Sequence, residues 1–282
     1  MTGAADESLP LSRFYDPRTP DISIKSTGQQ KAHPLKLRSA LPVLVCALGL
    51  VLPALAASAH ARESRPVVVE LFTAQGCAAC PDANQQIARL ADDPQVIVLT
   101  YGVDYWDYLG WEDTFAQPDF VARQRAYLQA QGQRNLITPQ IIIQGKQAMS
   151  AASAIALDQV VEVGRQTDHP PHIEFRETGD RVGVGSGQMP QGGAEVVAVR
   201  YTPGLRTVQV RSGDNRGRAV SHINVVRNVK RLGDWTGRPA LYALPVDVRE
   251  ATDNGDAILV MLQSKVDRRI LASAPLQEPR RD

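Results

Sequence analysis

Apolar and polar positions follow a helix-and-strand rhythm in the first half of the chain. Residues 67–72 and 96–103 are apolar and rich in β-branched side chains, which predicts two buried strands. Between them, residues 81–93 place Ile87 and Leu90 on one side of a helical pattern. The pattern therefore predicts a strand, a helix and a second strand in succession.

The same rhythm continues downstream. Pro118 favours the start of a helix, because a missing N–H is no loss at the first helical position. A strand is predicted within TPQIIIQGKQAMS (residues 138–150), followed by a helix over 153–166. Strands that alternate with helices predict an α/β domain over residues 65–168.

Beyond the proline-containing segment QTDHPPHIEF the pattern changes. Seven short runs of alternating polarity lie within residues 172–276, separated by turn signals such as Thr178-Gly179-Asp180, Pro203-Gly204 and Asp214-Asn215. These features predict an all-β, sandwich-like domain over residues 172–276, so the chain as a whole is expected to be α+β.

The N-terminal part carries targeting signals. Residues 1–38 are polar and lack apolar periodicity, which predicts a disordered extension. No charge occurs between Arg38 and Arg62, and the apolar run ends in small residues, so residues 39–61 predict a signal peptide. We expect a periplasmic or secreted protein. An uncleaved membrane anchor over residues 39–61 is the alternative.

Charge is balanced, with 31 Lys and Arg against 30 Asp and Glu. Nothing in this balance indicates binding to nucleic acid, and no stable membrane contact is expected once the signal is cleaved.

The cysteines carry the chemistry. Only three occur, and Cys46 lies inside the predicted signal peptide, which leaves Cys77 and Cys80 as a C-x-x-C pair between a strand and a helix. A helix N-terminus favours a thiolate, so Cys77 is expected to attack a substrate disulfide and Cys80 to resolve the mixed disulfide. Outside the cytosol the pair is expected to rest as a disulfide.

Other residues are candidates for the same site. Glu70 interrupts an apolar strand, where a buried acid can transfer protons to and from a cysteine or pair with a Lys or Arg. Thr138-Pro139 opens a later strand, where a cis proline would expose main chain to a peptide. Tyr105 and Trp106 belong to an aromatic block that can form either core or a binding wall.

The strand, the C-x-x-C helix and the later Thr-Pro strand together resemble the thioredoxin superfamily. More closely, ELFTAQGCAACPDAN, YGVDYWDYLGWEDTFA, RQRAY, TPQ and HINVVR are similar to a secreted bacterial family, domain of unknown function 1223, over residues 66–275. The resemblance implies a thioredoxin-like fold, with Glu70 where that superfamily keeps a buried aspartate. The dipeptide Ala78-Ala79 between the cysteines departs from well-known oxidoreductases, so no redox potential is carried over.

The sequence thus predicts an exported thiol–disulfide oxidoreductase without a cofactor, whose partners are protein or small-molecule disulfides and thiols and a redox partner protein. Copper binding or delivery is an alternative, because soft thiolates suit Cu(I). A zinc site would need four ligands, so histidines would have to join the two cysteines. The candidate histidines are His169, His172 and His222. A structural disulfide and a non-catalytic thioredoxin-like interaction module are the remaining alternatives.

Overall fold

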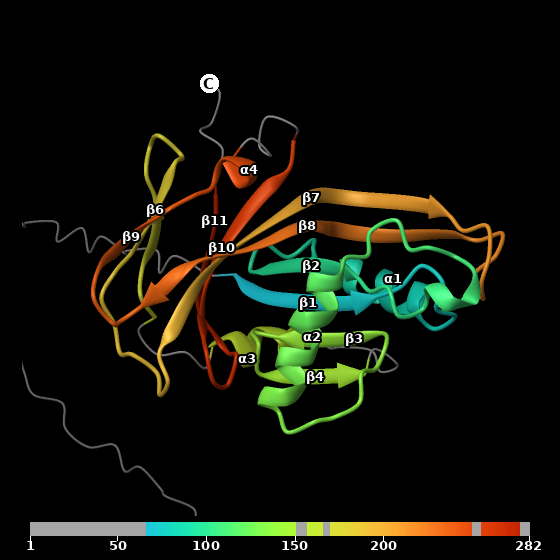
Figure 1. Cartoon of the computed structure of the whole chain (residues 1–282), viewed down its shortest axis with the longest axis horizontal. Coiled ribbons are helices and arrows are strands. Elements are labelled where there is room, and N and C mark those ends of the chain that lie inside the picture. The colour runs from blue at the N-terminus through green and yellow to red at the C-terminus, as the bar shows by residue number, and fades with distance from the viewer. Residues whose placement is uncertain (1–65, 151–156, 166–169, 250–254, 277–282) are drawn as a thin grey trace, which may run out of the picture. The chain divides into compact units, whose positions relative to one another are not determined.

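Among the described residues, three α-helices, a short 3-10 helix (η1, Asp107–Leu109) and four strands form the first half of the protein (Figure 1). The structure is a computed structural model that describes residues 66–150, 157–165, 170–249 and 255–276, so the predicted extension and signal peptide lie outside it. The elements are β1 (Val67–Thr73), α1 (Cys80–Leu90), β2 (Val96–Gly102), α2 (Pro118–Ala130), β3 (Gln140–Ile143), β4 (Gln147–Ser150) and α3 (Leu157–Arg165). Among the described helices, none is long and apolar enough to span a bilayer.

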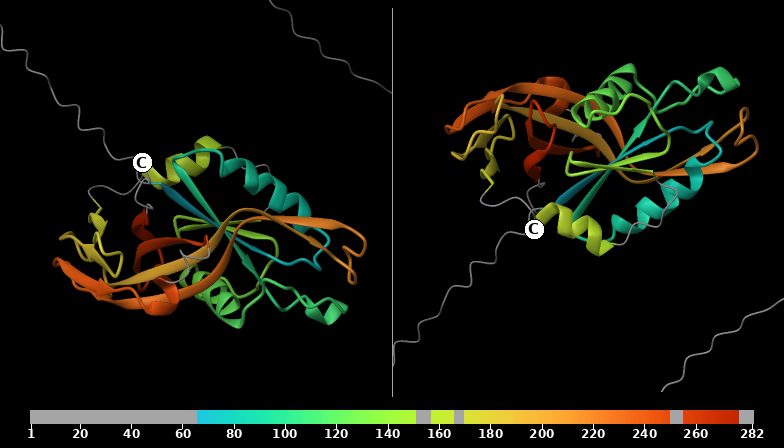
Figure 2. Two further views of the ribbon diagram at one scale, coloured as in Figure 1. Left: turned by 90° about the horizontal axis from the view of Figure 1, so that it is seen from above. Right: turned by 90° about the horizontal axis from the view of Figure 1, so that it is seen from below.

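These strands make a thioredoxin-like core. β1 pairs in parallel with β2 and antiparallel with β3, which pairs antiparallel with β4, so their order is β2-β1-β3-β4. Helices α1 and α3 cover one face of the sheet and α2 covers the other (Figure 2). The α/β prediction for this half is confirmed.

Strand β1 is central to this core, and all seven of its residues are buried. Because side chains alternate along a strand, Val67, Val69 and Leu71 pack with α1, while Val68 and Phe72 pack with α2. Both faces are covered by helices, which explains why β1 is an apolar run rather than an alternating one.

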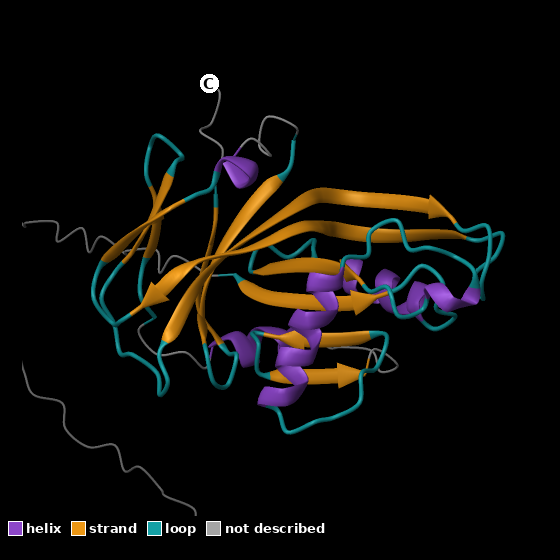
Figure 3. Cartoon of the chain, in the orientation of Figure 1, coloured by secondary structure: helices purple, strands orange, loops and turns teal. Residues whose placement is uncertain are grey.

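The second half is built mainly from strands. They are β5 (Ile173–Phe175), β6 (Arg181–Val184), β7 (Ala194–Gln209), β8 (Ala219–Trp235), β9 (Ala240–Ala243), β10 (Ala257–Ser264) and β11 (Ile270–Pro275), with a short helix α4 (Val246–Arg249). Four of them extend the sheet of the first half, whose full order is β11-β10-β7-β8-β2-β1-β3-β4 (Figure 3). The expectation of a sandwich separate from the α/β part is therefore corrected, and the overall class is α/β.

The junction between the halves is a parallel pairing of β2 with β8. Thr100 is the partner of Val225, and the Thr100 hydroxyl donates to the carbonyl oxygen of Ile223 at 2.5 Å. The Asn224 side chain donates to the carbonyl oxygen of Val98 at 3.0 Å. The remaining strands form a small antiparallel sheet of order β5-β6-β9, which packs on the extended part of the large sheet.

Local predictions have mixed outcomes. The turn predicted at Asp214-Asn215 joins β7 to β8, and the one at Thr178-Gly179-Asp180 joins β5 to β6. The turn predicted at Pro203-Gly204 is wrong, because β7 continues through it with a register shift, and the Gly204 N–H bonds to the Asn224 side chain at 2.9 Å. Residues 138–150 form a hairpin rather than one strand, since Gln144 and Gly145 adopt positive φ between β3 and β4.

Candidate functional site

Cys77 and Cys80 form a disulfide where the loop after β1 meets α1. The Cys80 N–H donates to the carbonyl oxygen of Cys77 at 3.1 Å, and α1 begins at Cys80. Cys77 is 1% exposed and Cys80 is fully buried, whereas Ala78 and Ala79 between them are exposed. The disulfide thus lies under a small, uncharged piece of surface.

The Thr138-Pro139 segment faces the disulfide. The Cys77 Sγ atom lies 3.9 Å from the carbonyl oxygen of Thr138, and the Thr138–Pro139 peptide bond is cis. Two residues that are 61 positions apart in the sequence are therefore in contact at the sulfur atom. A cis proline, which the sequence analysis considered at Thr138-Pro139, is thus present next to Cys77.

Two polar side chains hold this proline segment in place. The Tyr105 hydroxyl bonds to the Thr138 hydroxyl and lies 3.2 Å from the Gln124 side-chain oxygen. Gln124, fully buried on α2, donates to the Ile137 carbonyl oxygen at 2.9 Å and to the Gln140 side chain at 2.8 Å. Burial raises the pKa of the Tyr105 hydroxyl. Tyr105 thus contacts the site as a support for Thr138.

Trp106 lies on the aromatic segment beside the disulfide. Its ring packs on the core cluster that contains both cysteines and stacks with Tyr108 at 6.3 Å between centroids. Tyr108 is 78% exposed and Ile137 is 41% exposed. Tyr108 and Ile137 therefore leave apolar surface exposed on the segments that contain Trp106 and Thr138.

Two further residues fix the loop that leads to Cys77. Asn215, buried in the β7–β8 turn, donates from Nδ2 to the carbonyl oxygens of Gln75 at 2.9 Å and of Cys77 at 2.7 Å. On the other side, the Gln75 N–H donates to Asp113 Oδ2 at 2.6 Å. Burial raises the pKa of Asp113 to about 6, against an ordinary value of 3.8, although hydrogen bonds from the Gln75 and Phe115 N–H groups oppose the rise.

Glu70 lies in an ion pair. Arg123 Nε on α2 donates to Glu70 Oε1 at 2.7 Å, and the Tyr127 hydroxyl donates to Glu70 Oε2. Burial disfavours the charge on Arg123, but the Glu70 carboxylate outweighs it and raises the pKa of the guanidinium. For the Tyr127 hydroxyl, burial itself raises the pKa. Pairing with an arginine is one of the two roles that the sequence left open for Glu70.

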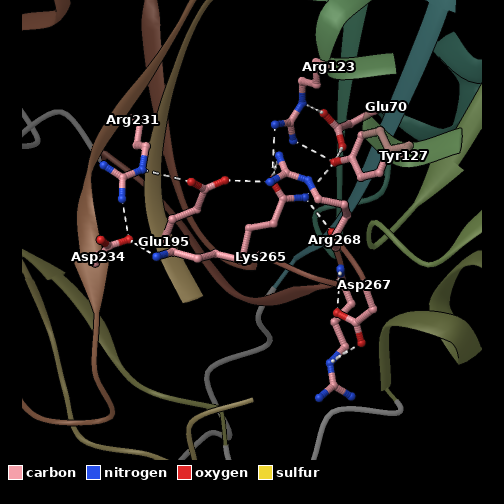
Figure 4. Close-up of polar contacts among 11 residues, drawn as sticks. Glu70, Arg123, Tyr127, Glu195, Arg231, Asp234, Lys265, Asp267 and Arg268 are labelled. Atoms are coloured by element: carbon pink, nitrogen blue, oxygen red, sulfur yellow. Dashed lines mark hydrogen bonds and ion pairs between the residues drawn. The ribbon is translucent and has the colours of Figure 1, made fainter. Parts of the chain in front are cut away.

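The ion pair belongs to a longer polar network (Figure 4). Gln263 of β10 accepts a hydrogen bond from Arg123 at 3.2 Å and another from Arg268 at 3.0 Å. Arg268 in turn pairs with Glu195 of β7 at 2.7 Å. The network joins the thioredoxin-like core to the added strands through charges.

Two of the three histidines named as alternative metal ligands lie within the described residues. His222 of β8 is buried with its ring edge-on to Phe115 at 5.3 Å between centroids, and burial lowers its pKa to about 4. His172 is exposed before β5, and His169 lies outside the described residues. Within the part of the chain that the structure describes, no group of three or more His, Cys, Asp or Glu side chains could hold a metal ion.

Sequence reasoning missed Gln75, Asp113, Gln124 and Asn215. Asn215 was visible only as a turn residue, and Asp113 only as one acid of the aromatic block. Their roles depend on contacts between residues that are 13 to 140 positions apart, which no local pattern reports.

Comparison with known proteins identifies the family of this chain. Residues 68–263 match the family model described as protein of unknown function (DUF1223). The crystal structure of protein AGR_C_4864 from Agrobacterium tumefaciens is 30% identical, with a TM-score of 0.62, over 77% of this chain and 96% of that one. HBP35 of Porphyromonas gingivalis is 14% identical, with a TM-score of 0.49, over 77% of this chain and 78% of that one. No curated protein matches the chain. The chain, with its thioredoxin-like core and C-x-x-C disulfide, belongs to the DUF1223 family.

Proposed function

We propose that this protein is an exported thiol–disulfide oxidoreductase that uses the Cys77–Cys80 pair. The observation that carries the proposal is the disulfide at the start of α1, with Cys77 Sγ 3.9 Å from the Thr138 carbonyl oxygen. A three-residue separation closes a very short loop, so the bond removes little entropy from the unfolded chain and is poorly explained as a stabilising crosslink. Export rests on the predicted signal over residues 39–61, which lie outside the described residues.

The exchange proceeds in two steps in the reducing direction. The Cys77 thiolate attacks a substrate disulfide, forms a mixed disulfide and releases one substrate thiolate. The Cys80 thiolate then attacks Cys77 Sγ, closes the protein disulfide and releases the second substrate thiolate. The substrate gains two electrons, the protein pair loses two, and the two released thiolates take up the protons that the pair gave up.

The remaining site residues have supporting roles in this proposal. Thr138 and Pro139 present main chain to the substrate beside Cys77, Tyr105 holds Thr138 through its hydroxyl, and Trp106 contributes apolar surface. For Glu70 we favour the ion pair, because Arg123 and Tyr127 occupy both of its carboxylate oxygens.

Accessibility is the most demanding requirement of the proposal, because Cys77 is 1% exposed in the oxidised form. The proposal requires that reduction makes this thiol reachable. After mild reduction, iodoacetamide should modify Cys77 in the folded protein faster than Cys80, with the labelled site read by peptide mass spectrometry.

The decisive experiment measures exchange with a range of peptide, protein and small-molecule disulfides. We expect Cys77→Ser to abolish exchange and Cys80→Ser to accumulate a mixed disulfide through Cys77. Ala122→Ser is the matched control, since it also introduces a serine, at an exposed position of α2, but keeps both cysteines, and it should exchange as the wild type does. If wild type and Cys77→Ser both fail with every substrate, the assignment is wrong.

A further inference from the structure

The tip of the β7–β8 hairpin reaches the loop of the disulfide. Asn215, in the turn between the two strands, is fully buried, and its Nδ2 atom donates to the Cys77 carbonyl oxygen at 2.7 Å. That same carbonyl accepts the Cys80 N–H at 3.1 Å. The Asn215 side chain is therefore bonded to the one main-chain oxygen that already links the two cysteines.

The contact is part of a close fit between segments. Nδ2 of Asn215 also bonds to the Gln75 carbonyl oxygen at 2.9 Å, and a Cβ atom on Gly213 would lie 3.7 Å from the Cα atom of Gly76. On its other side Asn215 is fixed by Arg218, whose Nη1 donates to Asn215 Oδ1 at 3.0 Å. The carboxamide thus has one orientation, with its donors toward the disulfide loop.

We infer that Asn215 is a positioning residue for the Cys77–Cys80 couple, which makes the β7–β8 hairpin a working part of the redox site. This inference rests on the proposed function, because it concerns the reactivity of the same pair. The hairpin lies outside the β1-to-α3 core, so the added strands supply a residue of the redox site.

The physical basis is the effective concentration of one thiol at the other. If the Cys77 carbonyl is held by both Asn215 and the Cys80 N–H, the two sulfur atoms stay near bonding distance after reduction. Preorganisation of this kind favours the intramolecular disulfide over two free thiols. Removing the Asn215 donor should therefore make the pair easier to reduce.

A merely structural role predicts a different result. If Asn215 only stabilised the fold, its loss would lower the free energy of unfolding in both redox states and leave the thiol–disulfide equilibrium unchanged. The readout is therefore the equilibrium constant of the pair with reduced and oxidised glutathione, measured in folded protein by trapping thiols and counting them by mass. This equilibrium is a property of the pair and is obtained whether or not protein substrates are exchanged.

We expect Asn215→Ala to lower the equilibrium constant for disulfide formation by about tenfold, a rise in potential of about 30 mV. Gln117→Ala is the matched control, because Gln117 Nε2 also donates to a main-chain oxygen of the hairpin, that of Arg227 at 2.8 Å, away from the disulfide. The control should match the wild type.

A second variant covers the case in which Asn215→Ala does not fold. Arg218→Ala removes only the contact that orients the carboxamide, from an exposed position, and should shift the equilibrium in the same direction by a smaller factor. An equilibrium constant unchanged in the folded Asn215→Ala protein, or in Arg218→Ala where the first cannot be purified, overturns the inference. Wild-type protein that equilibrates with glutathione but exchanges with no other disulfide would instead count against the proposed function alone.

Discussion

Arg123 Nε and Glu70 Oε1 lie 2.7 Å apart, and both side chains are almost completely withdrawn from solvent. Glu70 comes from the central strand β1 and Arg123 from the helix that covers it. Each charge is compensated by the other, with Tyr127 and Gln263 completing the set of hydrogen bonds. A buried pair of this kind depends on both partners being present.

Removing the cation alone should therefore be costly. We expect Arg123→Met to lower the free energy of unfolding by about 3–5 kcal/mol, because the Glu70 carboxylate would be left buried without a counter-charge. Glu70→Gln combined with Arg123→Met should lose less than Arg123→Met alone. Urea denaturation followed by circular dichroism measures both, and Arg125→Met, an exposed arginine on the same helix, should change the value by less than about 0.5 kcal/mol. If the single and double variants lose the same free energy of unfolding, the two buried charges do not compensate each other.

Asp113 should make the fold less stable as the pH rises through 6. Burial raises its pKa to about 6 from an ordinary 3.8, so the folded chain keeps a proton that the unfolded chain has released. Its favourable contribution is fully present below pH 3.8 and is lost above pH 6, a difference of about 3 kcal/mol. Asp113→Asn should remove this pH dependence, as measured by urea denaturation from pH 4 to 7. The exposed Asp119→Asn variant is the control, and a wild-type profile in Asp113→Asn would refute the assignment.

His222 should act with the opposite sign. Burial lowers its pKa to about 4 from an ordinary 6.5, so the unfolded chain binds a proton that the folded chain excludes. Its contribution to stability is present above pH 6.5 and is lost as the pH falls through 4, by about 3 kcal/mol. As the pH falls through 4, the free energy of unfolding should fall less in His222→Leu than in the wild type. The exposed His172→Leu variant should follow the wild-type acid profile. Parallel acid profiles of wild type and His222→Leu would count against this explanation.

Tyr108 tests the aromatic surface beside the disulfide. Because its ring is 78% exposed, Tyr108→Ala should alter the free energy of unfolding by less than about 0.5 kcal/mol. If the Trp106–Tyr108 stack contacts peptide substrates, the rate constant for exchange with a peptide disulfide should fall by about threefold to tenfold. Exchange with a small aliphatic disulfide should stay unchanged. Leu241→Ala, an exposed apolar residue on β9, is the control, and identical rates in all three proteins would show that the stack takes no part.

Local pattern was enough for the elements that carry the cysteines. Strand β1 and helix α1 follow from an apolar run and from the spacing of Ile87 and Leu90, and the C-x-x-C pair lies between them. The continuity of the sheet could not be predicted from the sequence, because the pairing of Thr100 with Val225 joins strands that are far apart in the chain. The alternating pattern of polar and apolar residues is the same in a strand that closes a sandwich and in one that extends a neighbouring sheet.

The same limit explains the errors at Pro203-Gly204 and at the site. A Pro-Gly pair is typical of a turn, but Asn224 from the adjacent strand bonds to the Gly204 N–H and lets β7 continue. Asn215 and Asp113 bond to main-chain atoms of a distant loop. Every residue has such main-chain atoms, so the sequence does not indicate which of them a side chain will contact.

The shared sheet has a practical consequence for anyone who divides this protein. Cutting the chain near residue 168 would strip β8 from β2, leaving a bare strand edge open to pairing with other molecules. It would also remove Val199 and Leu259 from the core cluster that contains Phe72 and Leu99. The two halves are thus not independent folding units. The fragment that ends near residue 168 should precipitate under conditions in which the intact polypeptide stays in solution.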